Sequence, residues 1–235
     1  MDIYKKISKI SKNIDHAAGA VADTICDIAY DVEQIKERDP AAASSLEVVA
    51  LYSGFHAVTA HKLSHALHAR GMVLTARAIS QGVKLLTGIE IHPGASLGKG
   101  VFIDHGAGVV IGETAVVGDN CTIYQGVTLG GTGKHTGKRH PTLGENVMVG
   151  AGAKILGPVT IGDRAKIAAG AIVLSEIPPD STAVGIPAKV VRRDGERVEQ
   201  DLDQMNIPDP VARELADLRG RVEALEGKKE REEDN

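Results

Sequence analysis

The sequence predicts an α+β protein, in which an N-terminal α-helical region precedes a parallel β-helix with an extruded loop, and a helical C-terminal tail follows. Three observations predict this architecture. Aliphatic residues recur every six positions through the middle of the chain, the composition includes 27 glycines and no tryptophan, and apolar residues follow three- and four-residue steps near both ends. The first pattern is typical of stacked short strands and the last of helices. We place the helical domain at 1–88, the β-helix at 89–191 and the tail at 192–235.

The six-residue repeat allows the faces of the β-helix to be indexed. Three repeats make one triangular coil, so every third repeat lies on the same face. An antiparallel β-sandwich would need the phasing of thirteen positions to be coincidental. The expected interior positions are Ile91, Ile111, Leu129, Ile155 and Val173 on face A, Leu97, Val117, Leu143 and Ile161 on face B, and Ile103, Ile123, Val149 and Ile167 on face C.

One corner breaks the repeat. The step from Ile103 to Ile111 is eight residues instead of six, and the extra residues follow Asp104 and His105 at the corner from face C to face A. Glu90 is expected one coil below, and the equivalent corners above carry small residues, including Ala151 and Ala169, which leave a groove leading down to His105. An acid beneath a histidine at the foot of a groove favours a catalytic site over an insertion of no consequence.

A loop at 130–142 interrupts the repeat at the corner from face A to face B. It lacks the glycine and Ser/Thr spacing of a phosphate-binding P-loop. Arg139 in this loop can grip a carboxylate with two parallel hydrogen bonds. In a threefold trimer this corner meets the C-to-A corner of the next subunit, so we expect a site shared between subunits.

The flanking segments predict helices. Residues 3–35 carry a heptad seam that ends at Asp39-Pro40, further helices are expected at about 44–70 and 73–86, and the tail repeats a short heptad over 211–225. His61, His65 and His68 share a helical face, which we interpret as packing and solvated residues in preference to a metal site.

Composition excludes several classes of protein. A net charge of -4 gives no electrostatic footprint for nucleic acid. The two cysteines have no paired spacing, so neither a disulfide framework nor a zinc cluster is expected. The sequence shows no signal-peptide pattern and no apolar run that could span a membrane, and we expect a cytoplasmic protein.

Several segments together carry a family resemblance. They are "RDPAA", "GFHAVTAHKLSHAL", "GIEIHPGASLGKGVFIDHGAGVVIGETA", "YQGVTLGGTGK" and "GKRHPTLG", with the more general "GAGAKILGP" and "VGIPAKVV". From Asp39 to about Val191 the chain resembles the serine O-acetyltransferases of the hexapeptide-repeat acyltransferase family. This resemblance implies a left-handed β-helix and transfer of acetyl from acetyl-CoA, as a co-substrate, to the hydroxyl of L-serine. It implies no tightly bound cofactor and no metal.

The resemblance also implies the site residues. The general base would be His105 with Glu90 as its acidic partner, a position where the family often has Asp; the substrate ammonium would meet Asp39 and Asp104, and the substrate carboxylate would meet Arg139 and His140. The CoA-binding candidates are Gly131, Thr132, Ala151, Lys166, Ala169 and Lys189.

The same resemblance implies the partners. We expect a homotrimer or a dimer of trimers, and inhibition by L-cysteine, which differs from serine only in sulfur for oxygen. Many relatives bind cysteine synthase through a C-terminal isoleucine. This sequence ends in Glu232-Glu233-Asp234-Asn235, so we expect no stable complex with that enzyme.

Three alternatives remain open at this point. A sugar O-acetyltransferase would share the β-helix and the CoA groove, but it would not need charged residues for both ends of an amino acid. A γ-class carbonic anhydrase-like enzyme would hold zinc between subunits, and His135 and His140 have a suggestive spacing. The third alternative is a scaffold without catalysis, which the Asp104-His105 corner disfavours.

Overall fold

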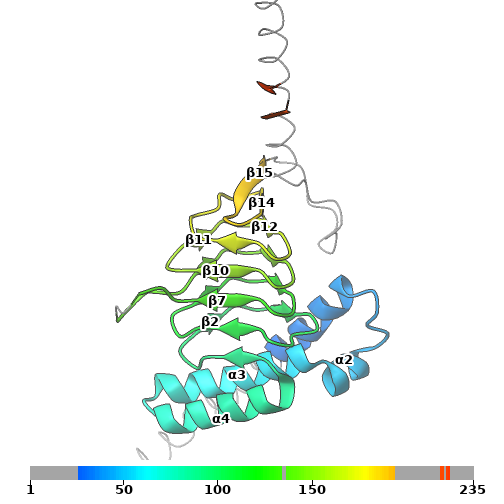
Figure 1. Ribbon diagram of the computed structural model, residues 1–235. Helices are drawn as coiled ribbons and strands as arrows, with labels where there is room; N and C mark the ends of the chain where they lie inside the picture. The colour runs from blue at the N-terminus through cyan, green and yellow to red at the C-terminus, as the bar shows by residue number, and fades with distance from the viewer. Residues whose placement is uncertain (1–25, 134–135, 194–217, 220, 223–235) are drawn as a thin grey trace, which may run out of the picture.

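The computed structural model describes residues 26–133, 136–193, 218, 219, 221 and 222. A layer of helices forms the base, and a tapering stack of short strands rises from it (Figure 1). A helix that ends at Arg38 precedes three further helices: α2 (Ser45–Leu51), α3 (Ser53–Ala69) and α4 (Val73–Thr87). The parallel sheets and the N-terminal helices confirm the coarse architecture expected from the sequence. Most of the predicted N-terminal heptad seam and of the predicted tail helix lies outside the described residues.

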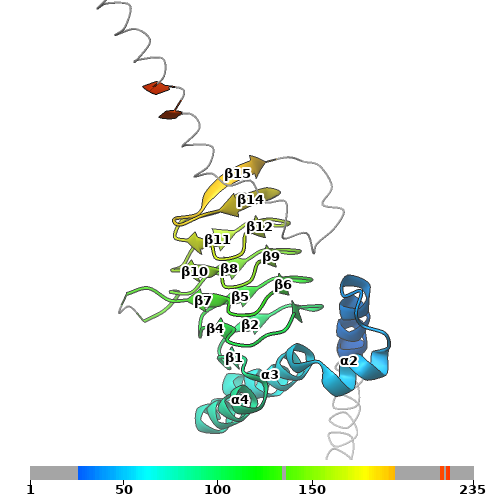
Figure 2. The same ribbon diagram turned by 45° about the vertical axis from the view of Figure 1, so that its right-hand side comes forward.

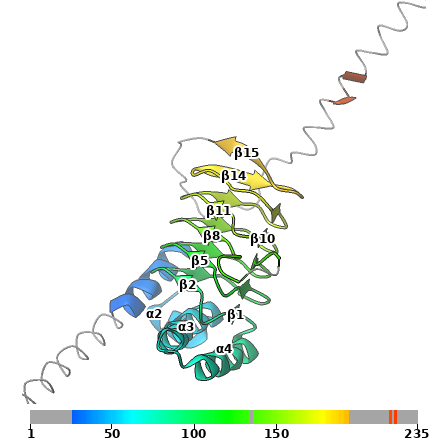
Figure 3. The same cartoon turned by 90° about the vertical axis from the view of Figure 1, so that its left-hand side faces the viewer.

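The strands form three sheets, one for each face of the prism (Figures 2 and 3). The sheet of face A contains β1 (Glu90–Ile91), β4 (Val110–Ile111), β7 (Thr128–Gly130), β10 (Lys154–Leu156) and β13 (Ile172–Val173). The sheet of face B contains β2 (Ser96–Leu97), β5 (Val116–Val117), β8 (Thr142–Leu143) and β11 (Thr160–Ile161). The sheet of face C contains β3 (Phe102–Ile103), β6 (Thr122–Ile123), β9 (Met148–Val149), β12 (Lys166–Ile167) and β14 (Ser181–Val184), and β15 (Lys189–Arg193) pairs antiparallel to β14.

The strand register confirms the indexed faces. Ile91 pairs with Ile111 on face A, and Ile103 pairs with Ile123 on face C. Every interior position predicted from the repeat is buried except Leu97, which is partly buried where the first coil meets the helices. Thin layers of small aliphatic side chains therefore form the core of the prism, as the scarcity of aromatic residues indicates.

The helical segment predicted over 44–70 is broken in the structure, which corrects that prediction. Tyr52 has extended backbone angles (φ -82°, ψ 107°) and separates α2 from α3. The Tyr52 hydroxyl donates to a carboxylate oxygen of Asp39 at 2.7 Å. The apolar pattern continues through the break, and a contact with a residue 13 positions away accompanies it.

The helices are held on the β-helix by polar contacts. Arg38 donates to the carbonyl oxygens of Gly100 and Asn120, the latter at 2.9 Å. His61 Nε2 donates to the Ala95 carbonyl at 3.2 Å and His65 Nδ1 to the Pro93 carbonyl at 2.8 Å, which confirms that these histidines are packing residues. Within the described ranges, no group of three or more histidine, cysteine or acidic side chains is placed to hold a metal ion. None of the described helices combines the length and apolar character needed to cross a bilayer.

Candidate functional site

The corner after β3 presents His105 to solvent. His105 has a left-handed backbone (φ 57°), as have Gly106 (φ 73°) and Gly108 (φ 74°). The extra residues are tied back into the stack, because the Gly108 N–H donates to the Gly88 carbonyl at 3.0 Å. A Cβ at Gly106 would overlap the Ile89 side chain, so glycine is required there. The His105 side chain is left 74% exposed.

Two carboxylates lie beside this histidine. The Asp104 side chain is 19% exposed, and its Oδ1 lies 3.9 Å from His105 Nε2. Burial raises the pKa of Asp104, His105 opposes the rise, and the negative charge of Asp39 adds to it. Asp39 is held by the Tyr52 hydroxyl at 2.7 Å and by the Ala41 N–H at 2.8 Å. The structure therefore brings Asp39, Asp104 and His105 together, and the two acids create a negative potential suited to a cation.

Glu90 has a different partner in the structure. Its carboxylate forms an ion pair of 2.6 Å with Lys84 of α4. That hydrogen bond lowers the pKa of Glu90, against the effect of burial. Among the described residues, no hydrogen bond or ion pair joins Glu90 to His105. The pairing of these two residues stays a prediction.

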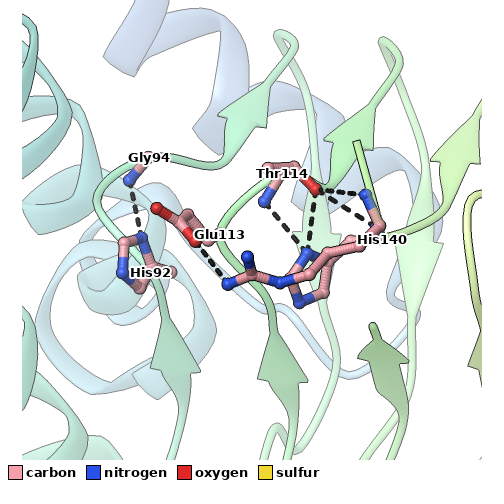
Figure 4. A network of polar contacts seen from close by, with 6 residues as sticks. His92, Gly94, Glu113, Thr114 and His140 are labelled. Atoms are coloured by element: carbon pink, nitrogen blue, oxygen red, sulfur yellow. Dashed lines mark hydrogen bonds and ion pairs between the residues drawn. The ribbon is translucent and has the colours of Figure 1, made fainter. Parts of the chain in front are cut away.

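Arg139 and His140 lie at the A-to-B corner, just before β8, and Figure 4 shows His140 beside Thr114. Arg139 Nη2 donates to Glu113 Oε2 at 2.5 Å. The Thr114 hydroxyl accepts the backbone N–H groups of Arg139 at 3.0 Å and of His140 at 3.1 Å. The C-terminal end of the β7–β8 connection is thus fixed to the coil below, and residues 131–133 and 136–138 before it are exposed.

Two buried or half-buried histidines flank this corner. The pKa of His140 is lowered mainly by burial and secondly by the positive charge of Arg139. The pKa of His92 is lowered mainly by burial and secondly by the positive charge of Arg77. The Nδ1 atom of His92 accepts a hydrogen bond from the Gly94 N–H at 3.0 Å (Figure 4). Both rings are therefore held neutral near pH 7, in contrast to the charged Arg139 beside them.

The predicted CoA-binding residues fall into separate groups. Ala151 and Ala169 stack at the C-to-A corners above His105, and the Gly170 N–H donates to the Ala151 carbonyl at 2.8 Å. Gly131 and Thr132 follow β7 on the A-to-B side, where the Thr132 N–H donates to the Arg139 carbonyl at 3.3 Å. Lys166 begins β12 on face C, and Lys189 begins β15. One chain therefore does not bring all these residues together.

The acidic corner and the Arg139–His140 corner lie at opposite edges of face A. Asp104 and His105 follow a strand of the face C sheet, whereas Arg139 and His140 precede a strand of the face B sheet. Both groups were predictable from the sequence, whereas four residues that hold them were not: Arg38, Tyr52, Glu113 and Thr114. The adjacent polar pair at 113–114, in the corner one coil below the long loop, is the signal that could have indicated the last two.

Family models match three parts of the chain. The model described as "Serine acetyltransferase, N-terminal" matches residues 5–60, "Hexapeptide repeat of succinyl-transferase" matches residues 108–131, and "Bacterial transferase hexapeptide (six repeats)" matches residues 140–175.

Whole proteins match over most of the chain. A serine acetyltransferase of Bacillus licheniformis is 50% identical over 207 residues, which cover 87% of this chain and 96% of that protein. A crystal structure of Neisseria gonorrhoeae serine acetyltransferase in complex with serine is 43% identical, with a TM-score of 0.71 over 77% of this chain and 74% of the other. A serine acetyltransferase structure in complex with cysteine is 39% identical, with a TM-score of 0.74 over 77% of this chain and 71% of the other.

Proposed function

Because this chain belongs to the serine acetyltransferase family, we propose that it transfers the acetyl group of acetyl-CoA to the hydroxyl of L-serine, giving O-acetylserine and CoA. This reaction is the first step of cysteine biosynthesis from serine. The observation that carries the proposal is the presence of two oppositely charged corners on one prism, Asp39 with Asp104 and Arg139 with His140. An amino acid needs both, since it carries an ammonium and a carboxylate.

His105 is the general base of the proposed reaction. Its ring is exposed at the corner below Ala151 and Ala169, where it can take the proton from the serine hydroxyl as the oxygen attacks the thioester carbonyl. The imidazolium then returns the proton to the departing CoA sulfur. Bound serine and acetyl-CoA react directly, so no covalent enzyme intermediate is needed. Glu90 supports the imidazolium in this proposal, which requires its carboxylate to exchange Lys84 for His105.

A homotrimer completes the site in this proposal. The extruded loop of one subunit carries Arg139 and His140 to the acidic corner of its neighbour, because the two corners of one chain lie at opposite edges of face A. Gly131 and Thr132 then face Ala151 and Ala169 of the neighbour across the CoA groove, with Lys166 and Lys189 for the phosphates. Whether trimers pair further does not affect this geometry.

L-cysteine is an inhibitor competitive with serine in this proposal. A pocket that holds the ammonium and the carboxylate also accepts an amino acid with sulfur in place of the hydroxyl oxygen. The relative that has been solved with cysteine supports this assignment.

Acceptor specificity provides the direct test. We expect CoA release from acetyl-CoA to depend on L-serine, and to stay at the background rate with a galactoside or maltose as acceptor. Added L-cysteine should raise the apparent KM for serine without changing kcat. Release that depends on a sugar and not on serine would overturn the proposed function.

A further inference from the structure

Every polar group of Thr114 is engaged with the segment that carries Arg139 and His140. The Thr114 hydroxyl oxygen accepts two backbone N–H groups, those of Arg139 and His140, at 3.0 and 3.1 Å. Its carbonyl oxygen accepts Lys138 Nζ at 2.8 Å. Its backbone N–H and its hydroxyl both lie against His140 Nδ1, at 3.2 and 2.9 Å (Figure 4). One residue of the coil thus organises the end of the long connection.

These contacts determine which nitrogen of His140 carries the proton. A backbone N–H can only donate, so the nitrogen that faces it, Nδ1, must present its lone pair. The hydroxyl leads to the same result, because both of its lone pairs are taken by the N–H groups of 139 and 140 and its own hydrogen is left to donate to Nδ1. In the neutral ring the proton therefore sits on Nε2.

Nε2 faces the place where the connection leaves the coil. A Cβ added to Gly131 would lie 3.0 Å from Nε2, and one added to Gly112 would overlap the ring, so both glycines leave space at this edge. Among the described residues, the hydrogen bonds made by this ring all involve Nδ1 and none involves Nε2. The ring is held on one side and offers a donor on the other.

The charges around the ring oppose its protonation. Burial is the largest cause that lowers the pKa of His140, and the positive charges of Arg139 and Lys138 in the connection lower it further. Of the charges that act on the ring, only Glu113 in the facing corner raises this pKa. Glu113 is paired with Arg139, which limits that opposing effect. The remaining titratable neighbour, His92, has a pKa that is itself lowered.

We propose that Thr114 is a positioning residue, which holds His140 with its ring proton on Nε2, so that His140 gives an uncharged hydrogen bond to the substrate carboxylate and cannot act as a base. The identity of the substrate rests on the proposed function, whereas the state of the ring does not. Arg139 supplies the charge for the carboxylate, and His140 adds direction without adding a second charge. Proton removal is then left to His105 alone.

The protonation state is tested first, on the wild-type protein. Two-bond 1H–15N correlation spectra of protein labelled with 15N-histidine distinguish the two neutral tautomers, and a His140→Gln variant assigns the signal. We expect Nε2 to be protonated and Nδ1 unprotonated from pH 7 to 8. A proton on Nδ1, or a charged ring at pH 7, would overturn the proposal whatever reaction the enzyme performs.

Two substitutions at Thr114 test the positioning role. Thr114→Val keeps the shape and the backbone N–H but removes the hydroxyl, so we expect the serine KM to rise about tenfold while the acetyl-CoA KM changes less than about twofold. Thr114→Ser keeps the hydroxyl and should restore most of the affinity for serine. The matched control is Thr160→Val, at the exposed position of strand β11, which should behave as the wild type.

The outcomes separate this proposal from the proposed function. An unchanged serine KM in Thr114→Val, or equal changes in both KM values, would refute the positioning role while serine acetylation itself stands. Wild-type protein that does not acetylate serine would refute the proposed function, and the spectra would still decide the state of His140. If Thr114→Val does not fold, the wild-type spectra and Thr114→Ser decide, since a Ser variant that loses affinity for serine contradicts the hydroxyl's role.

Discussion

The two corners that flank face A hold their histidines in opposite ways. His105 has a left-handed backbone conformation and a side chain that is 74% exposed, and the Asp104 carboxylate lies 3.9 Å from its Nε2. His140 is 8% exposed, and its ring is fixed through Nδ1 by two donors from Thr114. Each histidine directly follows a charged candidate for substrate binding, Asp104 or Arg139, so the two are alike in their sequence neighbourhoods.

The difference teaches that the surroundings of a histidine decide its role. A general base needs a nitrogen with an accessible lone pair, which the exposed ring of His105 offers. A binding residue benefits from a fixed orientation and a fixed tautomer, which His140 obtains from the coil below. Four experiments can test this division between an exposed base and a fixed binding residue.

His105→Ala should lower kcat by about 10²–10⁴-fold, because it removes the base that takes the hydroxyl proton. Steady-state kinetics at saturating serine and acetyl-CoA measure the effect. An unchanged unfolding temperature and hydrodynamic radius would show that the fold is retained. Turnover within a few-fold of the wild type would mean that another group removes the proton.

Arg139→Lys should raise the serine KM by about 10–100-fold and leave the acetyl-CoA KM nearly unchanged. Lysine keeps the positive charge but loses the planar fork that binds a carboxylate and that is aligned here by Glu113. Arg70→Lys at the end of α3 is the matched control, because Arg70 is exposed and its guanidinium contacts only its own helix among the described residues. A larger change in the acetyl-CoA KM would assign this corner to the other substrate.

Mixing two inactive variants tests whether the two corners come from different subunits. Equal amounts of His105→Ala and Arg139→Ala, after subunit exchange, should regain about a quarter of the wild-type sites, because one interface in four combines an intact His105 with an intact Arg139. Activity per subunit is measured after exchange has been verified by mass spectrometry. No recovery would mean that one chain supplies both residues of each site.

Asp39→Asn should lower the pKa of Asp104, since it removes a negative charge that now opposes ionisation of that carboxyl. The sign follows because a neutral neighbour makes the Asp104 carboxylate less unfavourable, so its proton leaves at lower pH. Carboxyl 13C NMR titration measures the shift, with Asp163→Asn on a distant corner as the control. An unmoved titration of Asp104 would show that the two acids are not electrostatically coupled, and would weaken their joint role in ammonium binding.

The repeat made the β-helix predictable in detail. Every third six-residue repeat lies on the same face of the prism. The strand partners of residues such as Ile111 and Ile123 could therefore be assigned without a structure. The corner with His105 was predictable for the same reason, because an extra residue in a strict repeat has to project. The catalytic pairing of Glu90 was expected from its place one coil below, and in the structure Lys84 of α4 is its partner instead. A helix packed under the first coil is not visible in the repeat.

The residues that hold the site were not predictable, because their contacts join distant parts of the chain. Thr114 contacts His140 across 26 positions, and Arg38 contacts Asn120 across 82. The break at Tyr52 is a further example. The local pattern favours one continuous helix, and the hydrogen bond that Tyr52 makes to Asp39 is part of the tertiary structure.

Arg38 has a consequence for how substrate affinity is controlled. It is the last helical residue before Asp39, and its guanidinium bridges carbonyl groups of two successive coils, at Gly100 and at Asn120. Asp39 therefore belongs to the helical region but takes its position from the β-helix, whereas His105 belongs to the β-helix itself. A small tilt of the helical region would displace Asp39, one of the two proposed ammonium ligands, and leave the proposed base His105 where it is. If these roles hold, the packing of the N-terminal helices on the β-helix sets how tightly the amino group of the substrate is bound, independently of the rate of acetyl transfer.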